Sequence, residues 1–217
     1  MRDLREQLRE CCPGRVCLMG LGNPEQGDDG FGVALAREMM RSGFGSGGNP
    51  KSLPADAGVS GSVPRMRLTV MLAETAPERF LGRVAEWGGE HLVFLDAVDF
   101  GGAPGSAVWL SAGEMAARFP QVSTHKLSLG LLARWVEASG TTKVWLLGVQ
   151  PQSVRPGDDL SPAVRASLEV LGSLMKEVWG PDAGADIQNH LLTGHKVGQA
   201  TCLPAGRMPV PPAGVST

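Results

Sequence analysis

Long apolar segments and clusters of positive charge are both missing from the sequence. No apolar run approaches the roughly 20 residues that a membrane-spanning helix requires. The amino-terminal segment MRDLREQLRECCPGR is charged throughout and lacks the apolar stretch of a signal peptide. The 20 Lys and Arg residues are balanced by 22 Asp and Glu residues, and no basic block occurs. These absences argue against membrane insertion and nucleic-acid binding, and they predict a cytoplasmic protein.

Cysteine is also scarce, with four residues in the chain. Cys11 and Cys12 are neighbours, Cys17 lies in an apolar segment, and Cys202 is near the carboxyl-terminal end. This spacing is neither a disulfide framework nor a CxxC zinc pattern, so we expect ordinary reduced thiols. A G-x-S-x-G motif and a Cys/His signature are absent too, which argues against serine or cysteine nucleophiles.

Apolar segments with strand character alternate with helical segments along most of the chain. This alternation predicts a doubly wound, mostly parallel sheet with helices on both faces. Helix caps are expected at Thr75, at Ser161 and at either Ser123 or Thr124, with Pro77 and Pro162 in first turns. The predicted strands are Val16–Gly20, Met66–Leu72, His91–Val98, Ser106–Leu110 and Lys143–Val149, and the predicted helices are about 30–42, 75–87, 114–119, 123–139 and 161–179.

One domain is expected, because 217 residues can bury one α/β core with little left for a second. We predict that it covers residues 15–179, after an amino-terminal extension at 1–14. Residues 43–64 are rich in Gly, Ser and Pro and are interpreted as a flexible insertion. Residues 180–217 form a Gly- and Pro-rich tail that we expect to be disordered.

The first loop, GLGNPEQGDDGFG, follows a predicted strand and precedes a predicted helix. A dinucleotide fingerprint would need a third glycine where Glu25 stands. A phosphate loop would need a cation and a hydroxyl where Asp28 and Asp29 stand, and two carboxylates would repel a phosphate. The loop is therefore expected to present a carboxylate to a cation or to a reaction needing an acid or base. Asp28 is interpreted as the helix cap, which leaves Asp29 for function.

Further candidates come from the rule that loops after the carboxyl ends of parallel strands carry function. Asp96 ends an apolar strand at that edge, where an unpartnered carboxylate is costly to bury. Asp99 is more simply a turn former. Among the histidines, His125 is expected to face the same crevice. The remaining histidines are His91, at the amino end of a strand, and His190 and His195, in the tail.

Asp29, Asp96 and His125 together offer two carboxylates and one imidazole. Such a donor set suits a borderline divalent ion such as nickel or zinc. Three ligands would leave coordination positions open, as a working site requires.

Five segments resemble, in order and spacing, the hydrogenase maturation endopeptidases. They are GLGNPEQGDDGFG, AETAPE, LDAVDFGGAPG, STHKLSL and LLGVQPQSVRPGDDLSP, within residues 16–178. STH and GVQP are most similar to the branch that processes the large subunit of hydrogenase 3, the formate hydrogenlyase enzyme. The chain departs from the family in its longer insertion and in AET at Ala73–Thr75, where the family often has DGG.

The resemblance implies a twisted five-strand sheet and the removal of a short carboxyl-terminal peptide from the nickel-loaded precursor of a [NiFe] hydrogenase large subunit. It implies that Asp29, Asp96 and His125 bind nickel that the precursor supplies, with no organic cofactor. We expect a monomer. Either the metal activates the carbonyl or water, or an aspartate acts as general base.

Three alternatives stay open at this point. The chain could be a non-catalytic nickel-sensing or escort module, which would bind loaded precursor without shortening it. It could also be a nucleotide-binding oxidoreductase, against which the missing third glycine argues. A protease of the same fold that cleaves another protein, such as a spore protease, is the third.

Overall fold

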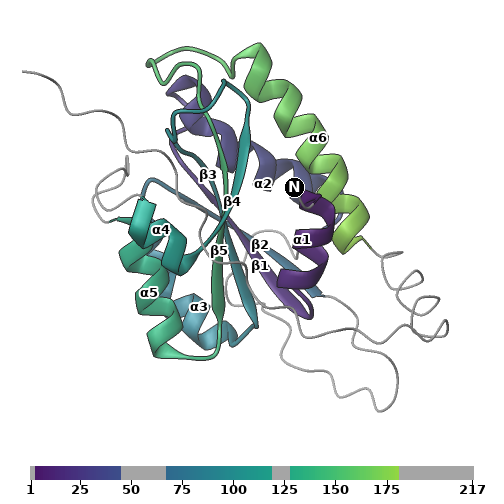
Figure 1. The fold of residues 1–217 in the computed structure, drawn as a ribbon, viewed down its shortest axis with the longest axis vertical. Helices are drawn as coiled ribbons and strands as arrows, with labels where there is room; N and C mark the ends of the chain where they lie inside the picture. Colours follow the sequence, from purple (N-terminus) through teal and green to yellow (C-terminus); the bar gives the residue numbers. More distant parts are fainter. Residues whose placement is uncertain (1–2, 45–66, 119–127, 181–217) are drawn as a thin grey trace, which may run out of the picture. The chain divides into compact units, whose positions relative to one another are not determined.

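The computed structural model describes residues 3–44, 67–118 and 128–180. Their strands are β1 (Arg15–Leu21), β2 (Arg67–Glu74), β3 (His91–Ala97), β4 (Ala107–Ser111) and β5 (Lys143–Val149). They form one sheet in the order β2-β1-β3-β5-β4 (Figure 1). All neighbours pair in parallel except the edge strand β4, which is antiparallel to β5. The predicted doubly wound, mostly parallel five-strand sheet is confirmed.

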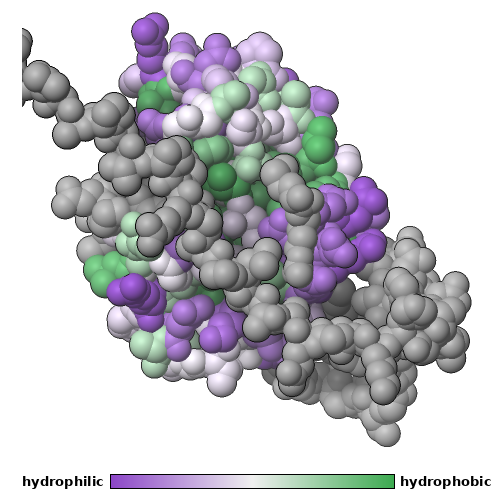
Figure 2. Space-filling view, viewed as in Figure 1, coloured by the Kyte–Doolittle hydropathy of each residue, from purple (hydrophilic) through white to green (hydrophobic). Residues whose placement is uncertain are grey.

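Helices cover both faces of the sheet, as the alternation of segments predicts. Figure 1 shows α3, α4 and α5 on one side of the sheet and α1, α2 and α6 on the other. In the space-filling view, hydrophobic side chains lie in the middle of the visible face, and hydrophilic ones flank them (Figure 2). The helical elements are α1 (Leu4–Cys11), η1 (Gly27–Gly30), α2 (Phe31–Arg41), η2 (Pro77–Phe80), α3 (Leu81–Trp87), α4 (Ala112–Arg118), α5 (Leu129–Ser139) and α6 (Pro162–Trp179), where η marks a 3-10 helix.

The central strands β1 and β3 are buried on both faces, which explains why their sequences are almost continuously apolar. Successive side chains of a strand point to opposite faces. Leu18 therefore joins the hydrophobic cluster that contains α2 and α6, whereas Met19 joins the cluster that contains α4 and α5. The two clusters hold the sheet between its two layers of helices.

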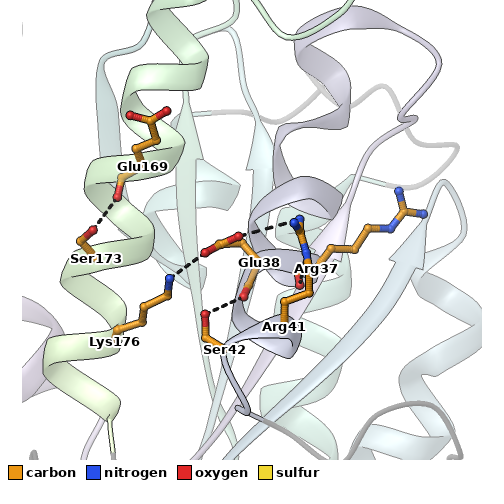
Figure 3. Close-up of polar contacts among 7 residues, drawn as sticks. All are labelled: Arg37, Glu38, Arg41, Ser42, Glu169, Ser173 and Lys176. Atoms are coloured by element: carbon orange, nitrogen blue, oxygen red, sulfur yellow. Dashed lines mark hydrogen bonds and ion pairs between the residues drawn. The ribbon is translucent and has the colours of Figure 1, made fainter.

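Helix α6 is fastened to α2 by packing and by one close ion pair. Lys176 Nζ lies 2.6 Å from Glu38 Oε1 (Figure 3). The hydrogen bond and the positive charge of Lys176 lower the pKa of the Glu38 carboxyl below its ordinary value. Ser42 Oγ donates to the Glu38 carbonyl oxygen at 3.0 Å and closes the end of α2. These contacts fix the helix that follows the first loop.

The amino-terminal segment contributes to the same core. Asp3 caps α1 by accepting a hydrogen bond from Arg5 N at 3.3 Å. Leu8 and Cys12 are fully buried in the cluster with α6. The described cysteines Cys11, Cys12 and Cys17 form no disulfide, and burial raises the pKa of Cys17 to about 12. Within the described ranges, no helix is both long and apolar enough to cross a bilayer.

Ser161 is confirmed as a helix cap, since its Oγ accepts a hydrogen bond from Val164 N at 3.4 Å, but the cap expected at Thr75 is wrong. Thr75 does not cap the next helix: η2 begins at Pro77 after Ala76, without a side-chain cap. Glu74 has a φ of 51° and redirects the chain before that point.

The helix expected to begin at Ser123 or Thr124 begins at Leu129 instead, as α5. The preceding residue, Ser128, is not helical, with a ψ of 129°, and its carbonyl oxygen accepts from Leu132 N at 3.1 Å. Ser123 and Thr124, the caps expected from the sequence, lie outside the described residues. The predicted insertion at 43–64 and the predicted tail at 180–217 lie almost wholly outside them as well.

Candidate active site

The first loop approaches the sheet very closely, and two glycines make this possible. Gly22 has a φ of 100°, and a Cβ there would collide with the Asp29 carbonyl oxygen. A Cβ on Gly32 would collide with the carbonyl oxygen of Leu95, near the end of β3. The turn η1 and the start of α2 are thereby placed against β3. Asp29 thus comes from an element that contacts the strand ending with Asp96 and Ala97.

Asp29 is almost completely buried, with 3% of its surface exposed. Its Oδ2 accepts a hydrogen bond from Asn23 N at 2.7 Å. Its Oδ1 is buried and has no hydrogen-bond partner among the described residues. Because buried polar atoms are usually hydrogen-bonded, an oxygen in this state is a natural cation ligand. The donor chemistry of Asp29 therefore fits a divalent metal.

Asp96 is the second predicted site residue, and it is 2% exposed. It lies opposite Gly148 in the parallel pairing of β3 with β5. Its Oδ1 accepts a hydrogen bond from Ala97 N at 2.9 Å. As predicted, this carboxylate is at the carboxyl edge of the sheet, beside the first loop.

Asp28 does not cap α2, so the cap interpretation is wrong. Gly30 precedes α2, and α2 has no side-chain cap. The fully buried Asp28 carboxylate instead accepts hydrogen bonds from Gln152 N at 2.7 Å, Ser153 N at 3.1 Å and Ser161 N at 2.6 Å. Burial opposes its charge, but these hydrogen bonds outweigh burial and lower the pKa of the Asp28 carboxyl.

The loop after β3 is organised by Gln150, a residue that the sequence reasoning missed. Gln150 Oε1 accepts from Phe100 N at 2.9 Å and from Gly102 N at 3.1 Å. Its Nε2 donates to Asp99 Oδ1 at 3.0 Å. Asp99 Oδ1 also accepts from Gly101 N at 3.1 Å, which confirms its role as a turn former. The available signal was a polar side chain directly after the apolar strand KVWLLGV.

A cavity of about 460 Å³ opens between the first loop and the loop that precedes α6. Its walls are Asn23–Gln26 and Pro156–Asp159. Glu25, Asp158 and Asp159 lie in this lining. One wall of the cavity therefore includes Asn23, whose backbone N–H donates to Asp29.

The histidines divide between the described and the undescribed parts of the chain. His91 is the first residue of β3, and its Nδ1 accepts from Trp145 Nε1 at 3.4 Å. It therefore lies at the opposite edge, as predicted. His125, His190 and His195 are outside the described residues. Within the described ranges, no three His, Cys, Asp or Glu side chains are grouped to hold a metal. The structure thus places Asp29 and Asp96, and His125 as their third partner stays a prediction.

Comparisons with known proteins agree with this fold. A family model described as hydrogenase maturation protease matches residues 61–177, which include Asp96 and His125. The hydrogenase expression/formation protein HupD of Rhodobacter capsulatus is 27% identical over 191 residues, covering 83% of this chain and 80% of HupD.

Solved structures that are named as hydrogenase maturation proteases or endopeptidases have the same fold as this chain. The [NiFe] hydrogenase maturation protease HycI from Thermococcus kodakarensis gives a TM-score of 0.62 at 24% identity, covering 82% of this chain and 99% of HycI. The hydrogenase maturating endopeptidase HybD from E. coli gives 0.55 at 25% identity, covering 75% of this chain and 93% of HybD. The family model matches more than half of the 217 residues. The chain therefore belongs to the hydrogenase maturation protease family and is a hydrolase.

Proposed function

We propose that this protein is an endopeptidase that removes a short carboxyl-terminal peptide from the nickel-loaded precursor of a [NiFe] hydrogenase large subunit. The observation that carries the proposal is the buried Asp29 Oδ1, which has no hydrogen-bond partner in the described part of the chain. It occurs at the carboxyl edge of the sheet, in a chain of the hydrogenase maturation protease family. The segments STH and GVQP favour a precursor of the hydrogenase 3 type.

Nickel enters this reaction as part of the substrate. Asp29, Asp96 and His125 are the residues that would bind it, because carboxylate and imidazole donors suit nickel. A precursor without nickel would offer the two buried carboxylates no cation, which explains selectivity for the loaded form. No organic cofactor is needed, since peptide hydrolysis consumes only water. We further propose a monomer that acts in the cytoplasm.

The hydrolysis itself needs a base and a polarised carbonyl. Water attacks the carbonyl carbon of the scissile peptide, the carbon–nitrogen bond breaks, and the departing amine takes a proton. A buried carboxylate at Asp29 or Asp96 can accept the proton from water. Nickel can alternatively polarise the carbonyl or lower the pKa of water. Both routes require the scissile bond to lie beside the same two carboxylates.

The test is the mass of nickel-loaded and nickel-free precursor before and after incubation with the protein. We expect the loaded precursor alone to lose its carboxyl-terminal peptide. Asp29→Asn, Asp96→Asn and His125→Ala are each expected to slow this loss by about 100-fold or more. Asp99→Asn is the matched control: it removes a carboxylate from the loop after β3, three residues beyond Asp96, but retains the oxygen that accepts from Gly101 and Gln150.

Equal cleavage of loaded and nickel-free precursor would overturn the proposal, as would full activity in all three site variants. Stable binding of the loaded precursor with no change in its mass would instead indicate a nickel-sensing or escort module.

A further inference from the structure

Asp28 is a buried carboxylate outside the predicted metal-binding set, and all its hydrogen bonds go to one distant loop. Oδ2 accepts from Gln152 N at 2.7 Å and Ser153 N at 3.1 Å. Oδ1 accepts from Ser161 N at 2.6 Å. These donors lie in residues 150–161, the loop between β5 and α6, which we call the last loop. The Asp28 side chain therefore joins the first loop to the last loop.

Backbone hydrogen bonds join the same two loops at Asp28 and just before it in the sequence. The bonds are Gly27 N to Asp158 O at 3.2 Å, Asp28 N to Ser153 O at 2.9 Å and Gly157 N to Glu25 O at 2.8 Å. The two loops are also the walls of the 460 Å³ cavity. The Asp28 contacts thus hold the turn η1 in one orientation relative to the last loop.

The orientation of η1 decides where Asp29 points. A 3-10 helix has three residues per turn, so adjacent side chains leave it about 120° apart. With Asp28 directed to the last loop, Asp29 is directed to Asn23 and into the buried edge of the sheet. A rotation of η1 would move both carboxylates together.

We propose that Asp28 is a positioning residue of the peptidase, which fixes the direction of the Asp29 carboxylate by anchoring η1 to the last loop. This inference rests on the proposed function. The three converging N–H donors require acceptor oxygens on both branches of the side chain. An asparagine has one acceptor oxygen, so its amide NH₂ would face an N–H donor and leave it unsatisfied.

The test compares Asp28→Asn with Thr142→Val, a matched loss of a buried hydrogen bond far from the site. Thr142 is 7% exposed, and its Oγ1 donates to Gly89 O at 2.7 Å at the amino edge of the sheet. Both variants are first measured for stability and then for cleavage of nickel-loaded precursor. We expect Asp28→Asn to slow cleavage by about 10- to 100-fold and Thr142→Val to stay within about twofold of wild type.

A double-variant cycle separates positioning from a general structural role. If Asp28 acts through Asp29, the variant with both Asp28→Asn and Asp29→Asn should cleave no more slowly than Asp29→Asn alone. Amide exchange of Gln152, Ser153 and Ser161 should accelerate in Asp28→Asn and stay unchanged in Thr142→Val. Should Asp28→Asn not fold, Asp28→Glu replaces it, because glutamate keeps two acceptor oxygens for the N–H donors while its longer side chain shifts η1 relative to the last loop.

The inference is overturned if Asp28→Asn and Thr142→Val lose cleavage activity equally at equal stability. It is also overturned if the double variant loses activity by the product of the losses in Asp28→Asn and Asp29→Asn. A wild-type protein that binds loaded precursor without shortening it would refute the proposed function instead. In that case the Kd for the loaded precursor is measured for the same single and double variants. Losses of affinity that multiply in the double variant again overturn the inference. A wild-type protein that neither binds nor cleaves the loaded precursor overturns both.

Discussion

The amino and carboxyl edges of the sheet both bury polar side chains, but they differ in how those side chains are satisfied. At the amino edge, Thr142 Oγ1 donates to Gly89 O at 2.7 Å, and the Trp145 indole donates to His91 Nδ1 at 3.4 Å. The Glu90 carboxylate there, although exposed, accepts from the backbone N–H of Arg15 in β1. Each of these side chains is hydrogen-bonded to another group of the protein, which stabilises the fold.

At the carboxyl edge, two adjacent aspartates behave in opposite ways. Asp28 uses both oxygens on backbone N–H groups of the last loop. Asp29 has one oxygen on Asn23 N and one that is buried without a hydrogen-bond partner in the described residues. The contrast indicates that Asp28 stabilises the structure, whereas Asp29 keeps one oxygen for a group that the described residues do not supply.

The largest effect is expected at Asp29, where one substitution should lower activity and raise stability. Asp29→Asn should lower cleavage of nickel-loaded precursor by about 100-fold or more. Its free energy of unfolding should rise by about 1 kcal/mol, because the variant no longer buries a carboxylate oxygen that has no hydrogen-bond partner among the described residues. Urea denaturation alongside precursor mass analysis measures both. A parallel fall in activity and stability would make Asp29 an ordinary structural residue.

The close approach that builds the carboxyl edge can be broken at Gly32. Gly32→Ala should lower the free energy of unfolding by about 3 kcal/mol, because the new Cβ collides with the backbone at Leu95. Gly113→Ala is the control, since nothing lies within 4 Å of a Cβ there. It should raise stability by about 0.5–1 kcal/mol in helix α4. Equal effects of the two substitutions would show that the approach is not tight.

At the amino edge, Thr142→Val tests whether a buried, hydrogen-bonded side chain contributes to stability alone. The nearly isosteric change leaves the Gly89 carbonyl oxygen without its donor. We expect the free energy of unfolding to fall by about 1–2 kcal/mol. The rate of precursor cleavage should stay unchanged when stability and cleavage are measured on the same preparation. A loss of cleavage at unchanged stability would mean that the amino edge also serves the reaction.

A smaller effect is expected at Glu74, the non-glycine residue of the described chain with positive φ. Glu74→Gly should raise the melting temperature by an amount equivalent to about 1 kcal/mol, because glycine adopts this conformation without strain. Arg37→Ala is the control, since Arg37 Nη2 lies 3.5 Å from Glu74 Oε1 on the exposed surface. That ion pair should contribute little. A destabilised Glu74→Gly would argue against backbone strain at this position.

The smallest effect concerns the pH dependence of the contact between α2 and α6. Lys176 lowers the pKa of Glu38 from its ordinary value of 4.5. A lowered folded-state pKa contributes stability above the unfolded value, and this contribution disappears as the pH falls through the folded pKa. The stability difference between wild type and Lys176→Met should therefore be full at neutral pH and shrink in acid. A difference that is constant with pH would contradict this assignment.

Much of the fold could be predicted because its signals are local. The apolar run KVWLLGV coincides with β5, and the Ser161–Pro162 pair marks the start of α6. The positions of Asp29 and Asp96 followed from one rule about the carboxyl edge of parallel sheets. Where the expected helix starts were wrong, backbone conformations that composition does not reveal had intervened, at Glu74 and Ser128.

The role of Asp28 could not be predicted because its partners are remote. Ser161 lies 133 residues away in sequence, and Gln152 lies 124 residues away. A local pattern offers only the nearest helix as a partner for such a carboxylate, which is why a cap was expected. Gln150 was missed for the same reason, since its contacts cross from β5 to the loop after β3. His125 stays a prediction.

Whether Asp29 binds the nickel of the precursor is tested by the nickel K-edge X-ray absorption spectrum of the loaded precursor, alone and rapidly frozen with the protein. We expect the wild-type protein to add oxygen or nitrogen scatterers to the nickel, and Asp29→Asn to reduce this addition. A spectrum that the protein leaves unchanged while the precursor is being shortened would contradict this expectation.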